Sequence, residues 1–222
     1  MCGLEYEEEE IFRILGIIRT NALQVQDPTM KLHGVSGRAV FPTLSYLSHS
    51  CICNARYSLS PKPQDRSIKV RAQRKIQQGE EITIQYLSFM YGHLKRKGTI
   101  KNFWFFDCNC PRCRDPTELD SYMSAMKCSD CENGNLLPLN PMEIETCQWS
   151  CDQCQHQQSS ESIKDYVGNC DESLSDPNGN TLTIARYEKM LQEFSQRLHP
   201  NHYLGKNTLH YQINVPVRIT GF

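Results

Sequence analysis

The fold is decided by the stretch Ser45–Asn54, SYLSHSCICN, together with the later stretch Gly79–Tyr86, GEEITIQY. The first stretch places a histidine and two cysteines within five residues, and all three are candidate metal ligands. In the second stretch, apolar and polar residues alternate after a Gln-Gly turn, which predicts a half-buried strand. The residues that share its buried face are Ile82, Ile84 and Tyr86.

A third stretch, Cys108–Cys113, reads CNCPRC and holds three thiols within six residues. Three thiols this close do not all pack as ordinary core cysteines, and three ligands leave a tetrahedral zinc ion one short. The fourth ligand is left open among Cys51, Cys53 and a histidine. A zinc ion with four thiolates carries a net negative charge, which we expect Arg112 and Arg114 to offset in part, together with backbone N–H groups.

Two further Cys-x-x-Cys pairs, Cys128–Cys131 and Cys151–Cys154, are separated by 19 residues. This spacing is typical of a four-thiolate zinc site, because each pair turns two thiolates toward one point. The alternatives are unrelated free thiols or a redox pair, and Cys147 competes as a wrong partner. The segment between the pairs contains one glycine and two prolines, so we expect a small loop-rich ribbon.

The chain has 222 residues, enough for one large domain or two small ones, and its formal net charge is −1. It lacks the basic surplus of a general nucleic-acid binder and any run of about 18 apolar residues that would span a membrane. The N-terminal sequence MCGLEYEEEEIF is acidic where a secretory signal would be basic. We therefore expect a cytoplasmic or nuclear protein, where clustered cysteines bind metals rather than form disulfides.

Apolar residues at helical spacing predict two helices. The acidic run Glu7–Glu10 suits the positive end of a helix dipole, and the apolar stripe from Ile11 to Ile18 is expected to face the core. The second, amphipathic helix covers residues 184–198. The remaining expectations are a strand at residues 67–72, a polar linker at 155–162, a turn at Asn178-Gly179 and no clear period over 207–222.

In this order, the three stretches resemble motifs of a known family. SYLSHSCICN is similar to the N-H-S-C-x-P-N segment of SET domains, GEEITIQY to their G-E-E-L-T-x-x-Y strand, and CNCPRC to their post-SET cysteines. Asn21 in RTNALQV, the segment CRDPTELDSYMSAMKC and the later cysteine pairs extend the likeness. Over roughly residues 10–206 the chain resembles the SET-and-MYND (SMYD) family, in particular its arthropod SmydA-type members.

The resemblance implies an α+β fold: a β-rich SET domain, a post-SET zinc element, a second small zinc ribbon and the start of a helical C-terminal domain. The family's glycine-rich cofactor loop and its MYND zinc finger are not found, so we expect a chain truncated at both ends. The resemblance also makes His199 and His202 residues of a helix junction rather than metal ligands. The expected boundaries are a partial SET domain at 1–106, the post-SET element at 107–118, the second zinc segment at 119–156, and a linker with helices at 157–222.

The family consists of S-adenosylmethionine-dependent protein-lysine methyltransferases, so the resemblance implies transfer of a methyl group to a lysine of a histone or another protein. Neither nucleic acid nor membrane is an expected direct partner. Tyr86 would lie at the lysine channel. The residues lining the cofactor would be Asn21, Leu47, Ser48, His49 and Phe106, the last stacked on the adenine. The zinc ligands would be Cys51, Cys108, Cys110 and Cys113 at one site, and Cys128, Cys131, Cys151 and Cys154 at the other.

Several residues depart from the family pattern. Ser48 replaces an asparagine that helps to hold the methionine part of the cofactor, and Cys53 replaces a proline. Trp104 stands in the place of the second channel tyrosine; it has no hydroxyl group and is larger, so it narrows or blocks the channel. Together with the missing glycine-rich loop, which leaves half of the family's cofactor pocket out of this sequence, these departures predict little or no activity for this chain. The alternative function is a zinc-stabilised SET-like scaffold without turnover, acting in protein–protein interaction or transcriptional regulation.

Overall fold

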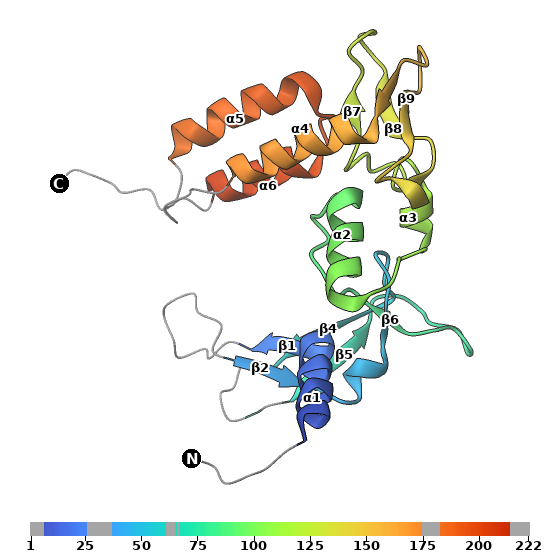
Figure 1. Cartoon of the computed structure of the whole chain (residues 1–222), viewed down its shortest axis with the longest axis vertical. Helices are drawn as coiled ribbons and strands as arrows, with labels where there is room; N and C mark the ends of the chain where they lie inside the picture. The colour runs from blue at the N-terminus through green and yellow to red at the C-terminus, as the bar shows by residue number, and fades with distance from the viewer. Residues whose placement is uncertain (1–6, 26–36, 61–64, 66, 175–182, 214–222) are drawn as a thin grey trace, which may run out of the picture. The chain divides into compact units, whose positions relative to one another are not determined.

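The computed structural model describes residues 7–25, 37–60, 65, 67–174 and 183–213 (Figure 1). The predicted mixture of helices and strands is confirmed. The chain divides into two compact units, the first made of Met1–Tyr86 and Ile100–Cys108, the second of Leu87–Thr99 and Asn109–Phe222. None of the helices in the described part of the chain has the length and apolar character needed to cross a membrane.

The first unit begins with helix α1, Glu8–Asn21, which has three glutamates in its first turn as predicted. The expected burial of its apolar stripe is wrong, because α1 contains no buried residue. Phe12, for example, is 64% exposed and Leu15 is 54% exposed. The periodicity of the apolar residues therefore identified the helix but not a covered face.

Among its described residues the first unit also contains three two-stranded sheets. Strands β1, Ala22–Val25, and β2, Gly37–Val40, are antiparallel. Strands β4, Ala55–Leu59, and β5, Ile68–Ala72, are also antiparallel, which confirms the predicted strand at residues 67–72. The third pair follows the short 3₁₀ helix η1, Leu44–Tyr46. The buried centre of this unit consists of Leu44, Ala55 and Ile84.

The third pair brings the two motif stretches together, because β3, Ser48–His49, lies parallel to β6, Thr83–Ile84. The predicted strand at the second stretch is thus confirmed, but it covers only Thr83–Ile84 and is shorter than the alternation indicates. The expected burial of Ile82 is wrong, because this residue is 44% exposed. Asn54 fixes the register: its amide donates to the carbonyl oxygen of Glu81 at 2.8 Å and accepts from the Thr83 N–H at 2.8 Å. The predicted turn is present, with Gly79 at a φ of 83° that favours glycine.

The second unit contains a four-stranded antiparallel sheet in the order β10-β9-β8-β7. Its strands confirm the small ribbon expected between the two later cysteine pairs. The predicted polar linker at residues 155–162 is wrong, because this segment supplies β10 and the start of a helix, where Ser159 accepts a hydrogen bond from the Ser162 N–H as N-cap. The strands are β7, Met126–Lys127, β8, Asn135–Pro138, β9, Gln148–Cys151, and β10, Gln157–Ser159.

Helices α4, α5 and α6 lie beside one another and pack with the ribbon around one core that includes the fully buried Trp149 (Figure 1). Helix α5 confirms the predicted amphipathic helix, and α6 is a further helix in the C-terminal part where the resemblance implies helices, although its residues from 207 onward show no clear period. The predicted turn at Asn178-Gly179 lies outside the described residues. The bounds are Ser160–Ser173 for α4, Ile184–Arg197 for α5 and Tyr203–Ile213 for α6.

The remaining elements are α2, α3 and the 3₁₀ helix η2, Pro141–Glu143. Helix α2, His93–Trp104, contributes its first seven residues to the second unit and its last five to the first. Helix α3, Pro111–Arg114, is a single turn that begins with proline, whose fixed φ suits the first helical position.

Candidate functional site

The first cysteine cluster consists of Cys51, Cys108, Cys110 and Cys113, whose four sulfur atoms all lie within 4.8 Å of one another. The Cys51 and Cys108 sulfurs are 4.0 Å apart. With Zn–S bonds of about 2.3 Å, tetrahedral geometry places thiolate sulfurs about 3.8 Å apart, so this donor set fits zinc. Among the candidates left open by the sequence, Cys51 joins the cluster, whereas the Cys53 thiol donates to the Gln73 side-chain oxygen at 3.6 Å.

The second cluster consists of the four predicted ligands, Cys128, Cys131, Cys151 and Cys154, again within 4.8 Å of one another. The Cys128–Cys154 and Cys131–Cys151 sulfur pairs are each 3.6 Å apart, far longer than a disulfide bond and close to the zinc tetrahedron. Cys147 packs at the edge of the helical core instead.

Backbone groups around the second cluster are arranged for thiolates. The Asp130 N–H donates to the Cys128 sulfur at 3.3 Å, and the Gln153 N–H donates to the Cys151 sulfur at 3.4 Å. Burial opposes ionisation of Cys151, but hydrogen bonds from the N–H groups of Cys154, at 3.5 Å, and Gln153 outweigh it and lower the pKa of its thiol to about 7. Gly134 lies against the sulfurs so closely that a Cβ atom there would be 2.2 Å from the Cys151 sulfur. The four-sulfur site and its glycine neighbour therefore fit a structural zinc ion.

His49 lies between the first cluster and Tyr86. Its Nδ1 accepts a hydrogen bond from the Tyr86 N–H at 3.1 Å, and its Nε2 lies 3.4 Å from the Cys51 sulfur. An accepting Nδ1 carries no proton, so the neutral ring is protonated at Nε2 and donates toward the sulfur. Because both ring nitrogens face protein atoms, a contact between His49 and a cofactor would come from its backbone.

The Tyr86 hydroxyl group donates to the Leu47 carbonyl oxygen at 2.6 Å. Burial, followed by the nearby carboxylate of Glu81, raises the pKa of Tyr86 above its ordinary value, so the phenol stays protonated at neutral pH. Its ring lies beside those of His49 and Trp104, with centroid distances of 5.2 Å to each. The structure thus brings the predicted channel residues into one aromatic cluster within the first unit.

The other predicted pocket residues differ in how they are placed relative to this aromatic cluster. Phe106 lies with its ring centroid 6.3 Å from that of His49. The Trp104 indole N–H donates to the Thr20 carbonyl oxygen at 2.8 Å, which ties the cluster to the end of α1 next to Asn21. The Asn21 amide group donates to the Ile17 carbonyl oxygen at 3.1 Å. Ser48 is exposed.

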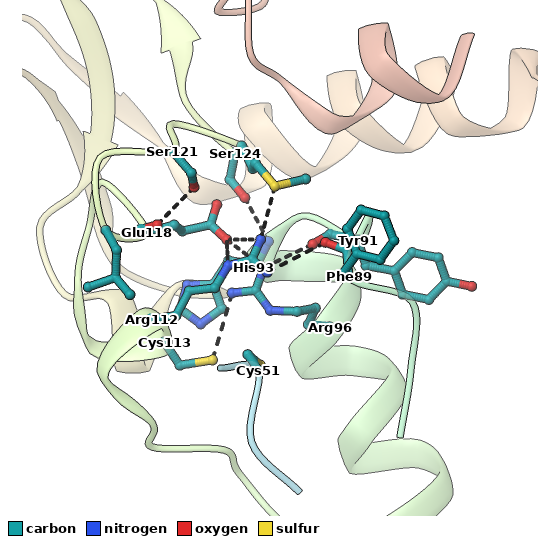
Figure 2. Close-up of polar contacts among 12 residues, drawn as sticks. Cys51, Phe89, Tyr91, His93, Arg96, Arg112, Cys113, Glu118, Ser121 and Ser124 are labelled. Atoms are coloured by element: carbon teal, nitrogen blue, oxygen red, sulfur yellow. Dashed lines mark hydrogen bonds and ion pairs between the residues drawn. The ribbon is translucent and has the colours of Figure 1, made fainter. Parts of the chain in front are cut away.

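Sequence reasoning missed a buried ion cluster in the second unit, formed by Arg96, Arg112 and Glu118 (Figure 2). The only signal in the sequence is the pair of arginines that flank Cys113, of which Arg112 is buried and Arg114 is exposed. Nothing in the local pattern identifies Arg96 or Glu118, because charged residues in a helix and a loop are usually solvated.

Comparison with known proteins supports the geometry. The family model described as "SET domain" matches residues 7–87. The SET domain-containing protein SmydA-8, isoform A, of Drosophila melanogaster is 33% identical over 150 residues, which cover 67% of this chain and 31% of that protein. The mouse Histone-lysine N-methyltransferase Smyd1 is 28% identical over 130 residues, covering 54% of this chain and 26% of that protein.

The N-lysine methyltransferase SMYD2-B of Xenopus laevis is 31% identical over 88 residues, covering 38% of this chain and 20% of that protein. The chain therefore spans about a third or less of the length of these relatives. The matched region includes the paired strands β3 and β6 together with His49 and Tyr86, whereas Trp104 and Phe106 lie after it. Motif order, two four-cysteine clusters and these relatives agree: the chain is a SET-domain protein of the SMYD family.

Proposed function

We propose that this protein contributes the lysine channel and part of the cofactor wall of an S-adenosylmethionine-dependent protein-lysine methyltransferase. The observation that carries the proposal is the hydrogen bond from the Tyr86 hydroxyl group to the Leu47 carbonyl oxygen, inside an aromatic cluster and within the residues that match a SET domain. The methyltransferases among its relatives support a protein substrate, such as a histone.

The proposed role of Tyr86 follows from its bonding. Since its only proton is donated to Leu47, the lone pairs of its oxygen remain to accept an N–H from a substrate amine. By accepting an N–H of a neutral lysine, Tyr86 would turn the nitrogen lone pair toward the methyl group to be transferred. Such orientation of the two reactants contributes strongly to the rate of a bimolecular displacement. The raised pKa of Tyr86 keeps this arrangement intact at neutral pH.

S-adenosylmethionine would supply an electrophilic methyl group on a sulfonium sulfur. Leu47, Ser48 and His49 would hold it mainly through their backbone, since the His49 ring already faces Tyr86 and Cys51. Phe106 is placed beside His49, where its ring can stack on the adenine. Asn21 follows Thr20, the residue whose carbonyl oxygen holds Trp104.

Zinc at the first cluster has a role in this proposal, because Cys51 lies two residues from His49 and accepts from its ring. The metal would fix the end of β3 and thereby the position of His49 under Tyr86. Zinc at the second cluster would stabilise the ribbon by joining the two loops that carry its cysteine pairs. A reducing compartment, the cytoplasm or nucleus, is the proposed location because free thiolates bind the metal.

A non-catalytic scaffold is the second candidate function, and Trp104 is the observation that favours it. Its ring contacts that of Tyr86, and its N–H is already used by Thr20, so it offers no hydroxyl group to a substrate. Ser48 also lacks the amide of the family's asparagine, and such a hydrogen bond contributes about 0.5–1.5 kcal/mol.

Calorimetric titration of the chain with S-adenosylmethionine, combined with methyl incorporation into a mixture of histones, separates the two functions. Micromolar binding with methyl incorporation supports the methyltransferase. Absence of both counts against it and supports the scaffold.

Trp104→Tyr tests the channel directly, because it restores a hydroxyl group next to Tyr86. We expect the variant to gain methyl incorporation, while cofactor affinity changes little. Phe103→Tyr is the matched control, since Phe103 is the adjacent, exposed aromatic residue and should have no effect. Equal activity in all three proteins would contradict the role given to Trp104.

A further inference from the structure

Two arginines lie directly opposite each other on the β4–β5 ribbon of the first unit (Figure 1). Arg56 on β4 and Arg71 on β5 are register partners, so their side chains leave the ribbon on the same face, with Cβ atoms about 4.5–5.5 Å apart. Both residues are exposed. Like charges at directly opposite positions destabilise a sheet, so this pair is not among the features that hold the ribbon together.

The other face of the ribbon supports the fold. Ala55 is 1% exposed in the core of the first unit, and Tyr57 and Ile68 pack against that core. The residues that alternate with these form an exposed surface, which we call the cationic face: Arg56, Ser58, Lys69 and Arg71. Packing of the core therefore requires no positive charge at either arginine.

The cationic face is poorly neutralised by the part of the chain that the structure describes. No carboxylate in that part forms an ion pair with Arg56, Lys69 or Arg71. Asp65 balances Lys69 in part, since its pKa is lowered by hydrogen bonds from Ser60 and Ser67 and, to a smaller extent, by Lys69. The two arginines are left without such a neighbour.

The guanidinium group of Arg71 is held in an extended position. Its Nη1 donates to the Ser58 Oγ at 3.1 Å, which directs the group across the cationic face toward β4 and Arg56. A guanidinium group presents its N–H donors as a planar fork that matches a carboxylate. The ribbon thus carries two such forks side by side.

The spacing of the positive charges fits an extended acidic peptide. Lys69 and Arg71 are two residues apart on β5, which separates their Cα atoms by about 6.6 Å along the strand. Alternate side chains of any extended peptide have the same spacing. A segment with acidic residues at alternate positions therefore matches the cationic face.

The small extent of the face favours a peptide over a nucleic acid. Strands β4 and β5 have five residues each, which corresponds to a length of about 16 Å. Binding to nucleic acid depends on positive charge spread over many phosphates, whereas the whole chain has a formal net charge of −1.

We propose that the cationic face of β4–β5 docks an extended acidic segment of a partner protein, with Arg56 and Arg71 as its main carboxylate-binding residues. The proposal goes beyond methyl transfer and does not depend on it. A lysine-rich histone tail has the wrong sign of charge for this face, so the segment belongs to a partner other than such a tail.

Fluorescence anisotropy with the full chain tests the proposal. The probe is a labelled ten-residue peptide in which glutamate and threonine alternate, and two reference peptides carry glutamine or lysine in place of glutamate. We expect only the acidic peptide to bind, and its affinity to fall as salt is added, because exposed charges are screened over about 10 Å at 0.1 M salt. Arg56→Gln/Arg71→Gln should weaken this binding at least about fivefold.

Arg186→Gln/Lys189→Gln is the matched control, because it removes two exposed positive charges from α5 and changes the net charge equally. It should bind the acidic peptide like the wild type. Absence of binding to the acidic peptide, or equal weakening in both double variants, would overturn the proposal. So would tighter binding of a twelve-base-pair DNA duplex than of the peptide, if Arg56→Gln/Arg71→Gln also abolishes it.

Urea unfolding separates a docking role from a structural one. Arg56→Gln should unfold at the same or a slightly higher urea concentration than the wild type, because it removes the repulsion from Arg71. A clearly lower midpoint would show that the charge supports the ribbon and would count against docking.

A charge-reversed protein gives a test that does not depend on loss of binding. Arg56→Glu/Arg71→Glu should no longer bind the acidic peptide and should gain binding of the lysine peptide. If it keeps the wild-type preference for the acidic peptide, the cationic face is not the docking surface.

Discussion

Gly134→Ala is expected to abolish the second zinc site. A Cβ atom added to Gly134 would lie 2.2 Å from the Cys151 sulfur, 2.6 Å from the Cys131 sulfur and 3.3 Å from the Cys128 Cβ. Non-bonded heavy atoms of this kind prefer separations of about 3.5–4.0 Å, so at least one sulfur has to move by about 1 Å. Zinc sites tolerate changes in ligand distance of only about 0.2 Å, and the site therefore cannot keep its four thiolates.

The stability lost with this zinc ion is large compared with the stability of a whole domain. A structural zinc ion contributes about 10–16 kcal/mol in small zinc-dependent domains, whereas a whole domain is typically stable by about 5–15 kcal/mol. Losing even part of that contribution should unfold the ribbon of β7 to β10. Native mass spectrometry should show one zinc per chain in Gly134→Ala and two in the wild type, and thermal unfolding should begin at a lower temperature in the variant.

Gly168→Ala is the matched control. Gly168 lies within α4, and a Cβ atom added there meets nothing within 4 Å. We expect two zinc ions and a gain in stability of about 0.5–1 kcal/mol, because alanine is the better helix former. If Gly134→Ala retains both zinc ions and the stability of the wild type, the close packing of Gly134 against thiolate ligands is refuted.

Three further perturbations give separate checks. Ile144→Ala, at a residue with 0% exposure in the core of the second unit, should cost about 2–5 kcal/mol of unfolding free energy in urea denaturation, and a cost under 1 kcal/mol would contradict the packing. Burial lowers the pKa of His202 from 6.5 to about 3, so only the unfolded chain takes up this proton as the pH falls below 6.5, and the free energy of unfolding should decline by about 1.4 kcal/mol per pH unit. His202→Asn should show a shallower decline in urea unfolding measured across this pH range, and identical pH profiles would count against the low pKa of His202. Tyr86→Phe removes the bond to Leu47 and should lower any methyl incorporation at least tenfold while changing S-adenosylmethionine affinity less than threefold, so retained incorporation would exclude Tyr86 from the channel.

The zinc clusters could be predicted because their information is local. The Cys-x-x-Cys pairs around Cys128 and Cys151 need only short turns to direct four sulfurs to one point, and the structure places them there. The fourth ligand of the first site could not be identified from local spacing, because it lies far from Cys108–Cys113 in the sequence. The spacing did not decide between Cys51, Cys53 and a histidine, and the family resemblance selected Cys51. In the structure Cys51, which follows β3, is the fourth member of the cluster.

Elements without a periodic pattern could not be predicted from the pattern of residues alone. Helix α6 has apolar residues around much of its surface, and its formation depends on packing against α5 rather than on one apolar stripe. The polar segment at 155–162 becomes β10 because Gln157 and Gln158 pair with β9, which tertiary structure decides and composition does not. Arg96 and Glu118 are 22 residues apart, and no pattern in the sequence links a helical arginine to a loop glutamate.

For the predicted lysine channel, the sequence identified the residues but not the hydrogen bonds between them. The motif placed Tyr86, His49 and Leu47 near one another, and the structure adds the bonds that join them. Their roles toward a cofactor and a lysine stay predictions. What the sequence could not provide is the orientation of the His49 ring, which turns one nitrogen to the Tyr86 backbone and the other to Cys51.

Zinc stoichiometry of the purified chain, with and without Cys51→Ser, tests the central claim most directly. The structure predicts two zinc ions per wild-type chain and one in the variant, because Cys51 completes the first four-sulfur site and takes no part in the second. Fewer than two zinc ions in the wild type, or two ions retained in Cys51→Ser, would contradict the account of the metal site that connects Cys51 with His49 and Tyr86.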